Sequence, residues 1–142
     1  MSDPKGHRDS AGIDLEHEYV ILERDEGART IRGGAAFWEA LMGGQLPDVE
    51  RGRLVTLFAF DGAWATWEIH PNGEELGVLI EGAVEFVLEE DGAQRSVTLE
   101  HTGSAIVIPR GTWHTARTKQ PTRVLFVTAG RGTEHRPASR RE

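Results

Sequence analysis

Residues 68–114 read EIHPNGEELGVLIEGAVEFVLEEDGAQRSVTLEHTGSAIVIPRGTWH, in which short apolar runs alternate with turn residues. The turn signals are Pro71-Asn72-Gly73, Glu81-Gly82, Asp91-Gly92 and Thr102-Gly103. Gly, Asn, Asp and Pro favour tight turns, and short strands at near-regular spacing are typical of β-sandwiches and barrels. This segment therefore predicts antiparallel strands that are joined by short connections.

Similar segments flank this region on both sides. One short helix is expected over residues 35–42, in an Ala-, Leu- and Met-rich stretch with a glycine pair at each end. The expected strands are Glu18–Glu23, Arg53–Phe60, Ala63–His70, Leu76–Ile80, Val84–Glu89, Arg95–Glu100, Ala105–Ile108, Trp113–Thr118 and Arg123–Thr128. The sequence thus predicts an all-β domain with one helix before the core strands.

Length and composition set the domain plan. The chain has 142 residues, a formal net charge of −7 and no cysteine. We expect a disordered tail over residues 1–12, a single domain over 13–129 and a polar C-terminal tail over 130–142, with the arginines of that tail in solvent.

The same numbers bear on partners and location. The acidic balance, without a basic stripe, argues against a nucleic-acid partner. The polar start has no apolar stretch of a secretory signal, and the longest mostly apolar run, residues 54–60, is too short to span a bilayer. We expect a cytoplasmic protein without a membrane partner.

Side chains that could bind a metal ion or a substrate share one face of the strand expected over residues 63–70. Its alternation places Trp64, Thr66, Glu68 and His70 on that face, and Trp67 on the opposite one. Glu68 and His70 are then about 6.6 Å apart along the strand, close enough to converge on one ion. A tight turn follows, so a carboxylate after it, Glu75 or its neighbour Glu74, returns opposite them.

Two spacings in this region resemble the two motifs of the cupin family. The first is Glu68-x-His70-x4-Glu75-x6-Gly82, in which Glu68 stands where the family has its first histidine. The second is Gly103-x5-Pro109-x-Gly111-x2-His114, with Thr118 in place of a closing Asn. The resemblance covers about residues 53–128. It favours Glu75 over Glu74, since only Glu75 keeps the spacing to Gly82.

The resemblance implies a jelly-roll barrel, the double-stranded β-helix of cupins, and one divalent metal ion. Carried over by position, the metal ligands would be Glu68, His70, Glu75 and His114. Nitrogen and oxygen donors without thiolate suit Mn, Fe, Ni or Zn. The alternative is a metal-free cluster in which protonated imidazoles balance the two carboxylates. The remaining histidines fit no ligand spacing, namely His7, His17, His101 and His135.

The function expected from this reading is that of a small metal-dependent enzyme acting on a small polar metabolite. Dioxygenase, isomerase and lyase chemistry all occur on this fold, and the catalytic residues stay unknown. Trp64 and Thr66 share the ligand face and are the candidate substrate-binding residues. The alternative is a non-catalytic module that binds or senses a small molecule. We also expect a homodimer in which segment Glu18–Glu23 adds to the partner's sheet.

Overall fold

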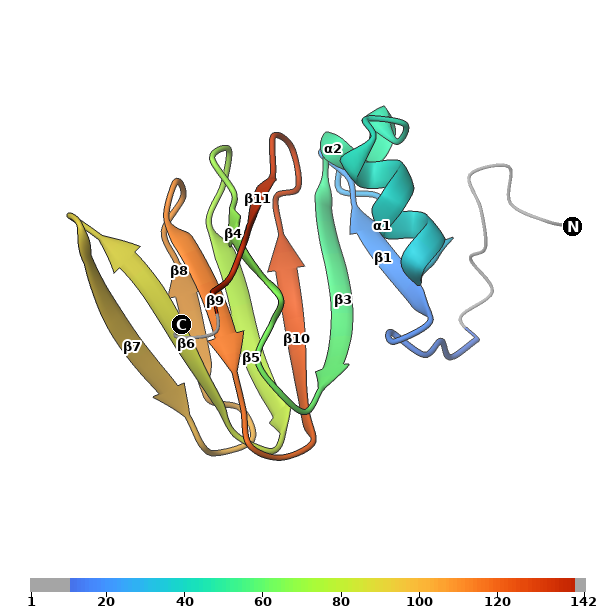
Figure 1. Cartoon of the computed structure of the whole chain (residues 1–142). Helices are drawn as coiled ribbons and strands as arrows, with labels where there is room; N and C mark the ends of the chain where they lie inside the picture. Colours follow the sequence, from blue (N-terminus) through green and yellow to red (C-terminus); the bar gives the residue numbers. More distant parts are fainter. Residues whose placement is uncertain (1–10, 140–142) are drawn as a thin grey trace, which may run out of the picture.

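The computed structural model describes residues 11–139 and consists of two antiparallel sheets that face each other (Figure 1). The six-stranded sheet has the order β2 (Ala28–Arg32), β1 (Glu18–Leu22), β3 (Arg53–Phe60), β10 (Thr122–Thr128), β5 (Glu75–Glu81) and β8 (Ala105–Ile108). The five-stranded sheet has the order β11 (Glu134–Pro137), β4 (Thr66–Ile69), β9 (Trp113–Arg117), β6 (Val84–Glu90) and β7 (Ala93–Leu99). The all-β jelly-roll expectation is confirmed.

Most elements fall where the sequence predicted them. Helix α1 spans Ala35–Met42, and strands β3 and β8 have the expected bounds. Three elements were not expected: β2, a four-residue helix α2 (Pro47–Glu50), and β11, which lies in the segment assigned to a polar tail. The tail expected over residues 1–12 falls almost wholly outside the described residues. No helix in the described part is long and apolar enough to cross a membrane.

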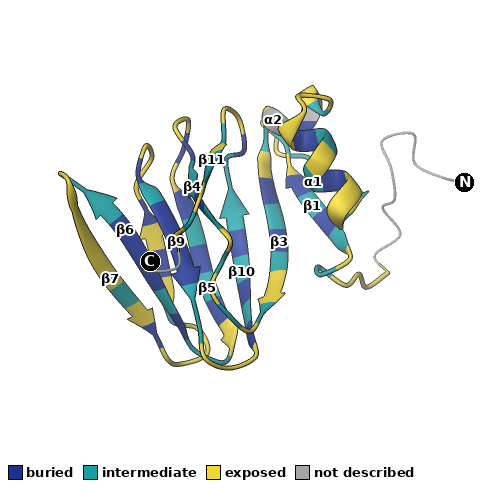
Figure 2. Cartoon of the chain, in the orientation of Figure 1, coloured by how far each residue is buried: buried dark blue, intermediate teal, exposed yellow. Residues whose placement is uncertain are grey.

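Alternating side chains fill the space between the sheets (Figure 2). Leu79 and Val124 of one sheet pack against Phe86 and Ala116 of the other, and each is at most 1% exposed. A second apolar cluster joins α1 to the edge of the six-stranded sheet through Phe37, Leu41, Tyr19, Ile21 and Leu54. Period-two alternation on strands therefore builds the barrel core, while the helix closes its open side.

Two glycines of the expected motifs have clear backbone roles. Gly82 has φ +89°, and a Cβ there would lie 2.5 Å from the carbonyl oxygen of Pro121. Gly111 has φ +71°, and its N–H donates to the carbonyl of His70 at 3.1 Å. Because glycine adopts these conformations without strain, the turn at Gly82 in the first motif and the turn at Gly111 in the second depend on them.

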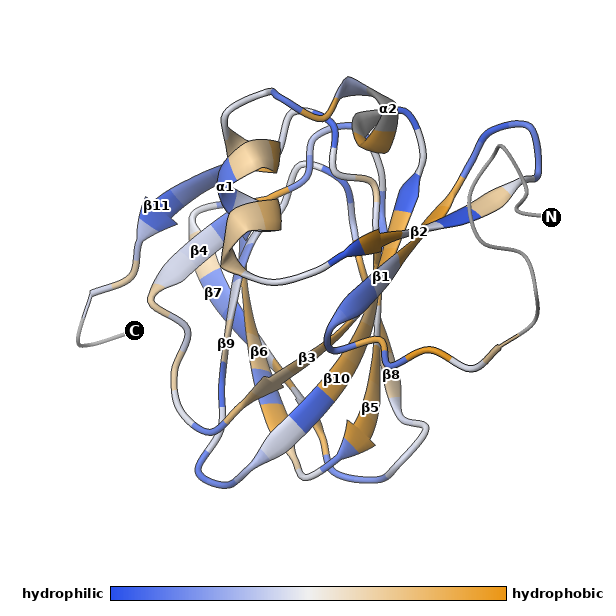
Figure 3. Ribbon diagram, turned by 90° about the vertical axis from the view of Figure 1, so that its right-hand side faces the viewer, coloured by the Kyte–Doolittle hydropathy of each residue, from blue (hydrophilic) through white to orange (hydrophobic). Residues whose placement is uncertain are grey.

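The outer face of the six-stranded sheet carries a row of apolar side chains. Register pairs align one row across five strands, Val20, Val55, Val127, Leu76 and Val107. The neighbours of these residues along each strand are buried, except for the half-buried Thr128, so the row points away from the core. Figure 3 shows the hydrophobic colouring of β3, β10 and β5. Strand β1 pairs with β2 on one side and with β3 on the other within its own chain.

Strand β11 is fastened to the outer face of its sheet by one arginine. The Arg136 guanidinium lies 5.0 Å from the ring centre of Trp67 and 4.6 Å from that of Trp113. Its Nη2 also donates to Glu89 Oε2 at 2.6 Å. Cation–π contacts on two rings, added to an ion pair, hold the strand more firmly than the ion pair alone.

Replacing this arginine should measurably loosen the fold. We expect Arg136→Ala to lower the free energy of unfolding by about 1–2 kcal/mol, because both ring contacts and the ion pair are lost. The matched control is Arg117→Ala, which removes a similarly exposed ion pair of 2.6 Å on the same sheet. It should cost about 0.2–1 kcal/mol in urea unfolding. Equal losses for the two variants would contradict the role given to the rings.

Candidate metal centre

The site is built from neighbouring strands of the five-stranded sheet. Glu68 on β4 is in register with His114 on β9, and on its other side with His135 on β11. His70 follows Glu68 by two residues, so both side chains lie on the same face. The register between the three strands, together with the two-residue spacing of Glu68 and His70, therefore places these side chains on the inside of the barrel.

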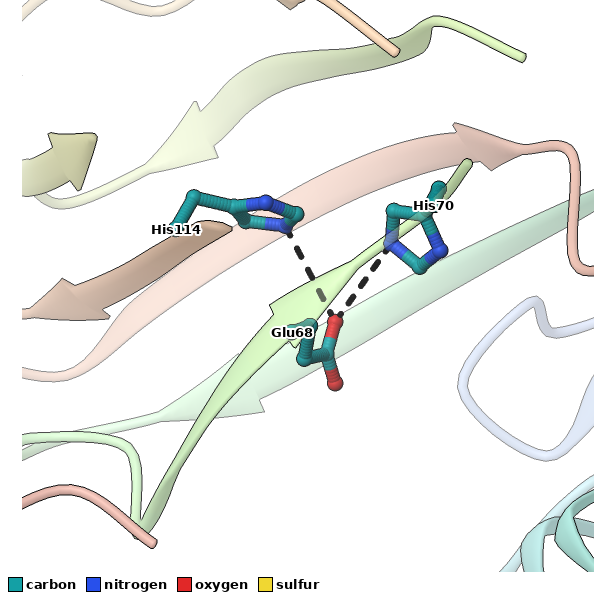
Figure 4. A group of neighbouring side chains, drawn as sticks. All are labelled: Glu68, His70 and His114. Atoms are coloured by element: carbon teal, nitrogen blue, oxygen red, sulfur yellow. Dashed lines mark ion pairs between the residues drawn. The ribbon is translucent and has the colours of Figure 1, made fainter. Parts of the chain in front are cut away.

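Three of these residues offer ligand atoms that all lie within 4.8 Å of one another, Glu68, His70 and His114. Figure 4 shows both imidazoles turned toward the Glu68 carboxylate. Glu68 Oε1 lies 3.7 Å from His70 Nε2 and 3.9 Å from His114 Nε2. The contacts are too long for hydrogen bonds and leave a space between the three groups.

Glu75 reaches the same imidazoles from the opposite sheet, where it begins β5. Its Oε2 is 3.2 Å from His70 Nε2, and its Oε1 is 3.1 Å from His114 Nε2. Glu75 is 3% exposed, whereas Glu74 is exposed to solvent. The structure thus brings all four predicted ligand residues together, with the imidazoles between two carboxylates.

Hydrogen bonds on the far side of each imidazole fix its tautomer. His114 Nδ1 lies 3.1 Å from the Thr112 carbonyl, which only accepts, so Nδ1 carries the proton. The Thr133 hydroxyl donates to the Gly130 carbonyl and therefore accepts from His70 Nδ1 at 2.8 Å. In neutral imidazoles both Nε2 lone pairs then face the carboxylates, which is the arrangement of metal-binding histidines.

The carboxylates are oriented in a comparable way. The Thr128 hydroxyl donates to Glu75 Oε2 at 2.5 Å, and His135 Nε2 donates to Glu68 Oε2 at 3.1 Å. Each carboxylate is therefore held by a partner beyond the two imidazoles. Such outer contacts fix the direction of a ligand and tune its affinity.

The central atoms have no hydrogen-bond partner. His70 Nε2, His114 Nε2 and Glu75 Oε1 are buried, and their close contacts lack hydrogen-bond alignment. Two ligands at right angles on one ion, each at about 2.1–2.2 Å, stand about 3.0–3.1 Å apart. The 3.1 and 3.2 Å contacts of Glu75 match that separation. The donor set therefore fits a divalent ion.

Electrostatics in the ion-free cluster favour charged groups. Burial opposes ionisation of Glu68, but contacts with His135 and His70 lower its pKa to about 2. Burial likewise disfavours the anion of Glu75, yet His114 and His70 hold its pKa well below the usual range. Burial would also lower the pKa of His70, but Glu68 and Glu75 raise it to about 10. A proton on His70 and a metal ion are thus competing ways to neutralise the carboxylates.

Glu68, His70 and Glu75 of the cluster line a cavity of about 470 Å³. Trp64 and Thr66, the candidate substrate-binding residues, line this cavity, and Trp67 does not. Trp64 packs edge-on against His114, with 6.4 Å between ring centres. A second cavity of about 480 Å³ near Asp14 and Arg32 contains none of the cluster residues.

Sequence reasoning missed the outer partners of the ligands. His135 was set aside because it fits no ligand spacing, yet register brings it beside Glu68. Thr128 and Thr133 are ordinary residues in the sequence, and only the folded chain places their hydroxyls on Glu75 and His70. The one available signal was the period-two pattern around His135, which is too short to identify a strand.

The charge pattern sets the pH dependence of the metal-free protein. His70 stabilises the fold fully below pH 6.5, and the contribution is lost as pH rises through about 10. Glu68 contributes above pH 4.5, and this is lost as pH falls through about 2. We expect the free energy of unfolding in urea, measured with chelator, to be highest between pH 4.5 and 6.5.

His70→Asn should flatten the alkaline decline, because the raised pKa belongs to that imidazole. His101→Asn changes an exposed histidine outside the cluster and should leave the decline intact. Stability that stays level from pH 6.5 to 10 in the wild-type protein would show that the imidazole is neutral in the ion-free fold.

Comparisons with known proteins agree with the geometry. The family model for the cupin domain matches residues 58–128, which is half of the chain. A search of curated proteins finds no match. Among solved structures, a cupin-2 domain containing protein from Shewanella frigidimarina is 21% identical with a TM-score of 0.46, over 53% of this chain and 68% of that one.

Two further structures extend the comparison. A cupin superfamily protein from Desulfitobacterium hafniense is 17% identical with a TM-score of 0.45, over 54% of this chain and 65% of that one. The oxalate decarboxylase of Bacillus subtilis, a protein with Mn(II) centres, is 19% identical with a TM-score of 0.51, over 60% of this chain and 23% of that one. At such identities the likeness concerns the fold. With the family model spanning the core strands and the cluster at their inner ends, the chain belongs to the cupin family.

Proposed function

We propose that the protein is a metal-dependent cupin enzyme that acts on a small molecule. The observation that carries this proposal is the set of buried, unpartnered ligand atoms of His70, His114 and Glu75, beside a cavity that Glu68, His70 and Glu75 line. Buried polar atoms without partners are costly, and a bound group that satisfies them removes this cost. The cavity gives a small molecule access to that point.

Each of the four residues would contribute a donor atom to one divalent ion. His70 and His114 offer Nε2 lone pairs, while Glu75 and Glu68 offer one oxygen each and balance the charge of the ion. When bound, Mn, Fe, Ni or Zn supplies Lewis acidity, and Mn or Fe adds redox chemistry. Dioxygenase, isomerase and lyase reactions remain the candidate classes, because the fold does not select among them.

The alternative function is a binding or sensing module. It is favoured by the absence of a free acid or base in the cavity lining, as far as the described residues show. The histidine that lines the cavity outside the ligand set, His135, is already bonded to Glu68. An exchangeable water on the bound metal, detected by water relaxation with Mn(II), supports the enzyme; its absence supports the module. Cytoplasmic location and the lack of a nucleic-acid partner stay predictions from the sequence.

Metal binding is the first test. Added Mn, Fe, Ni or Zn should stabilise the protein by about 2.7 kcal/mol at a hundredfold excess over its dissociation constant. We expect His114→Ala to abolish this effect, because it removes a ligand that touches both carboxylates. His135→Ala should weaken metal affinity about tenfold or more, because it removes the outer hydrogen bond to Glu68. Thermal unfolding with calorimetric titration measures both changes.

Glu68→Ala decides whether this carboxylate ligates. A sharp drop in affinity makes Glu68 a ligand, whereas a small change leaves His70, Glu75 and His114 as a three-residue site. His17→Ala is the matched control, because His17 is a highly exposed histidine outside the cluster. If neither a chelator nor any added ion changes the melting temperature of the wild-type protein, the charge-balanced, metal-free cluster is the better explanation.

We also propose that the protein is a homodimer, now through the outer face of the six-stranded sheet. The apolar row of Val20, Val55, Val127, Leu76 and Val107 is self-complementary across a twofold axis. Val107 is 60% exposed, and Ile80 on the same sheet is 37% exposed. Extended apolar sheet faces of this kind are covered in most soluble proteins.

A charge on this face should separate the copies. We expect Val107→Lys to shift the sedimentation coefficient from dimer to monomer without loss of the β-sheet circular dichroism, because the side chain is exposed. The control Met42→Lys places the same charge on an exposed apolar residue of α1 and should leave the dimer intact. A wild-type monomer at high micromolar concentration would exclude the interface.

A further inference from the structure

Much of the cavity wall is apolar, in contrast to the polar cluster of carboxylates and imidazoles. Helix α1 contributes Trp38, Leu41 and Met42, and β3 contributes Phe58. Phe58 and Met42 are 39% and 63% exposed, although both are large and apolar. Apolar side chains that remain exposed around a concave site are typical of ligand pockets.

Aromatic rings form the wall beside the ligands. Trp64 lies 6.0 Å from Phe58 and 5.7 Å from Phe126, ring centre to ring centre, and all three line the cavity. Their mutual packing fixes the ring orientations before any molecule enters. Preset aromatic faces favour a flat ring over a flexible polar chain, because stacking then costs little ordering entropy.

The charge of the lining limits the charge of the occupant. Among the described residues no Lys or Arg lines the cavity, and the carboxylates there are Glu68 and Glu75. Those two charges already balance a divalent ion. A dianion would therefore bring uncompensated charge into an apolar space, which is costly. A neutral molecule or a monoanion avoids this cost.

We propose that the pocket takes a ring-bearing, mostly apolar molecule with at most one negative charge, which approaches the metal through two adjacent oxygens. This rests on the proposed metal-dependent function and replaces the small polar metabolite expected from the sequence. With these four protein ligands, a six-coordinate ion would have two further positions, which two vicinal oxygens would fill. The volume of about 470 Å³ is within the usual range for small organic ligands, about 300–1,000 Å³.

The test compares two probes on zinc-loaded protein, since zinc binds substrates without redox turnover. The first probe is 4-nitrocatechol, a ring with two adjacent oxygens and a visible absorption band. The second is oxalate, a dianion without an apolar body. We expect 4-nitrocatechol to bind at least tenfold more tightly than oxalate in calorimetric titration. Equal or tighter binding of oxalate overturns the proposal.

Variants in the cavity wall give an independent readout. Phe58→Ala and Met42→Ala should each weaken 4-nitrocatechol about fivefold, and leave zinc affinity unchanged, because they remove apolar contact and no ligand. Ile80→Ala, on the outer face of the same sheet at 37% exposure, is the matched control and should change neither affinity. Unchanged 4-nitrocatechol binding in both wall variants overturns the proposal.

Failure of the metal function is separable from failure of the pocket. If the protein binds no zinc, yet binds 4-nitrocatechol in a way that Phe58→Ala weakens, the apolar-ring assignment stands and the metal-dependent function falls. If zinc binds and neither probe depends on Phe58 or Met42, the metal site stands and the ring assignment is overturned.

Discussion

The buried carboxylate of Glu75 constrains everything around it. Its 3% exposure makes an uncompensated negative charge there too costly to keep. The sheet opposite meets this demand with His70 and His114, and Thr128 of its own sheet adds a hydroxyl. Since these partners come from both sheets, the charge at Glu75 ties the two layers to one another. A divalent ion and a protonated imidazole are two solutions to the same electrostatic problem.

The protonation of the two Nε2 atoms distinguishes the cluster with a bound cation from the cluster with protonated imidazoles. Both Nδ1 atoms are committed to acceptors, so the inner nitrogens carry either a lone pair or an added proton. With lone pairs, each 3.1–3.2 Å contact to Glu75 is a repulsion between electron-rich atoms, and a cation must stand between them. With protons, the cluster is a network of ion pairs that a metal must displace. Acid and metal therefore act against each other at this site.

Local patterns predicted the parts of the fold that depend on one strand or one turn. Alternation located β3 and β8, and the spacing from Gly103 to His114 identified the histidine of the cluster on β9. Strand β2 follows a turn without a strong signal, and its side chains are mostly half-exposed, so its alternation is weak. Strand β11 has three polar residues and a proline, without an apolar alternation, and its Arg136 lies on tryptophans that are distant in the sequence.

The candidate site divides in the same way. Glu68, His70, Glu75 and His114 were recognisable because fixed spacings on turns and strand ends place them. The contact of His135 with Glu68 arises from register between strands 67 residues apart, which no local pattern encodes. The sequence also did not predict the apolar wall of the cavity. The apolar residues of α1 have the pattern of a helix that packs on a core, and only the fold places them in the same cavity as the cluster. Pairing between strands that are distant in the sequence is the feature that is hardest to predict from a single sequence.

The position of β11 matters for anyone who trims this protein. The segment that matches the family ends at residue 128, before β11 begins, and starts at residue 58, after α1. A fragment cut to those borders would keep the four side chains of the cluster. It would lack the histidine that steadies Glu68, the hydroxyl of Thr133 that orients His70, and the helical wall of the cavity. Family borders thus enclose the donor atoms but not the parts of the chain that aim them and shape the space beside them.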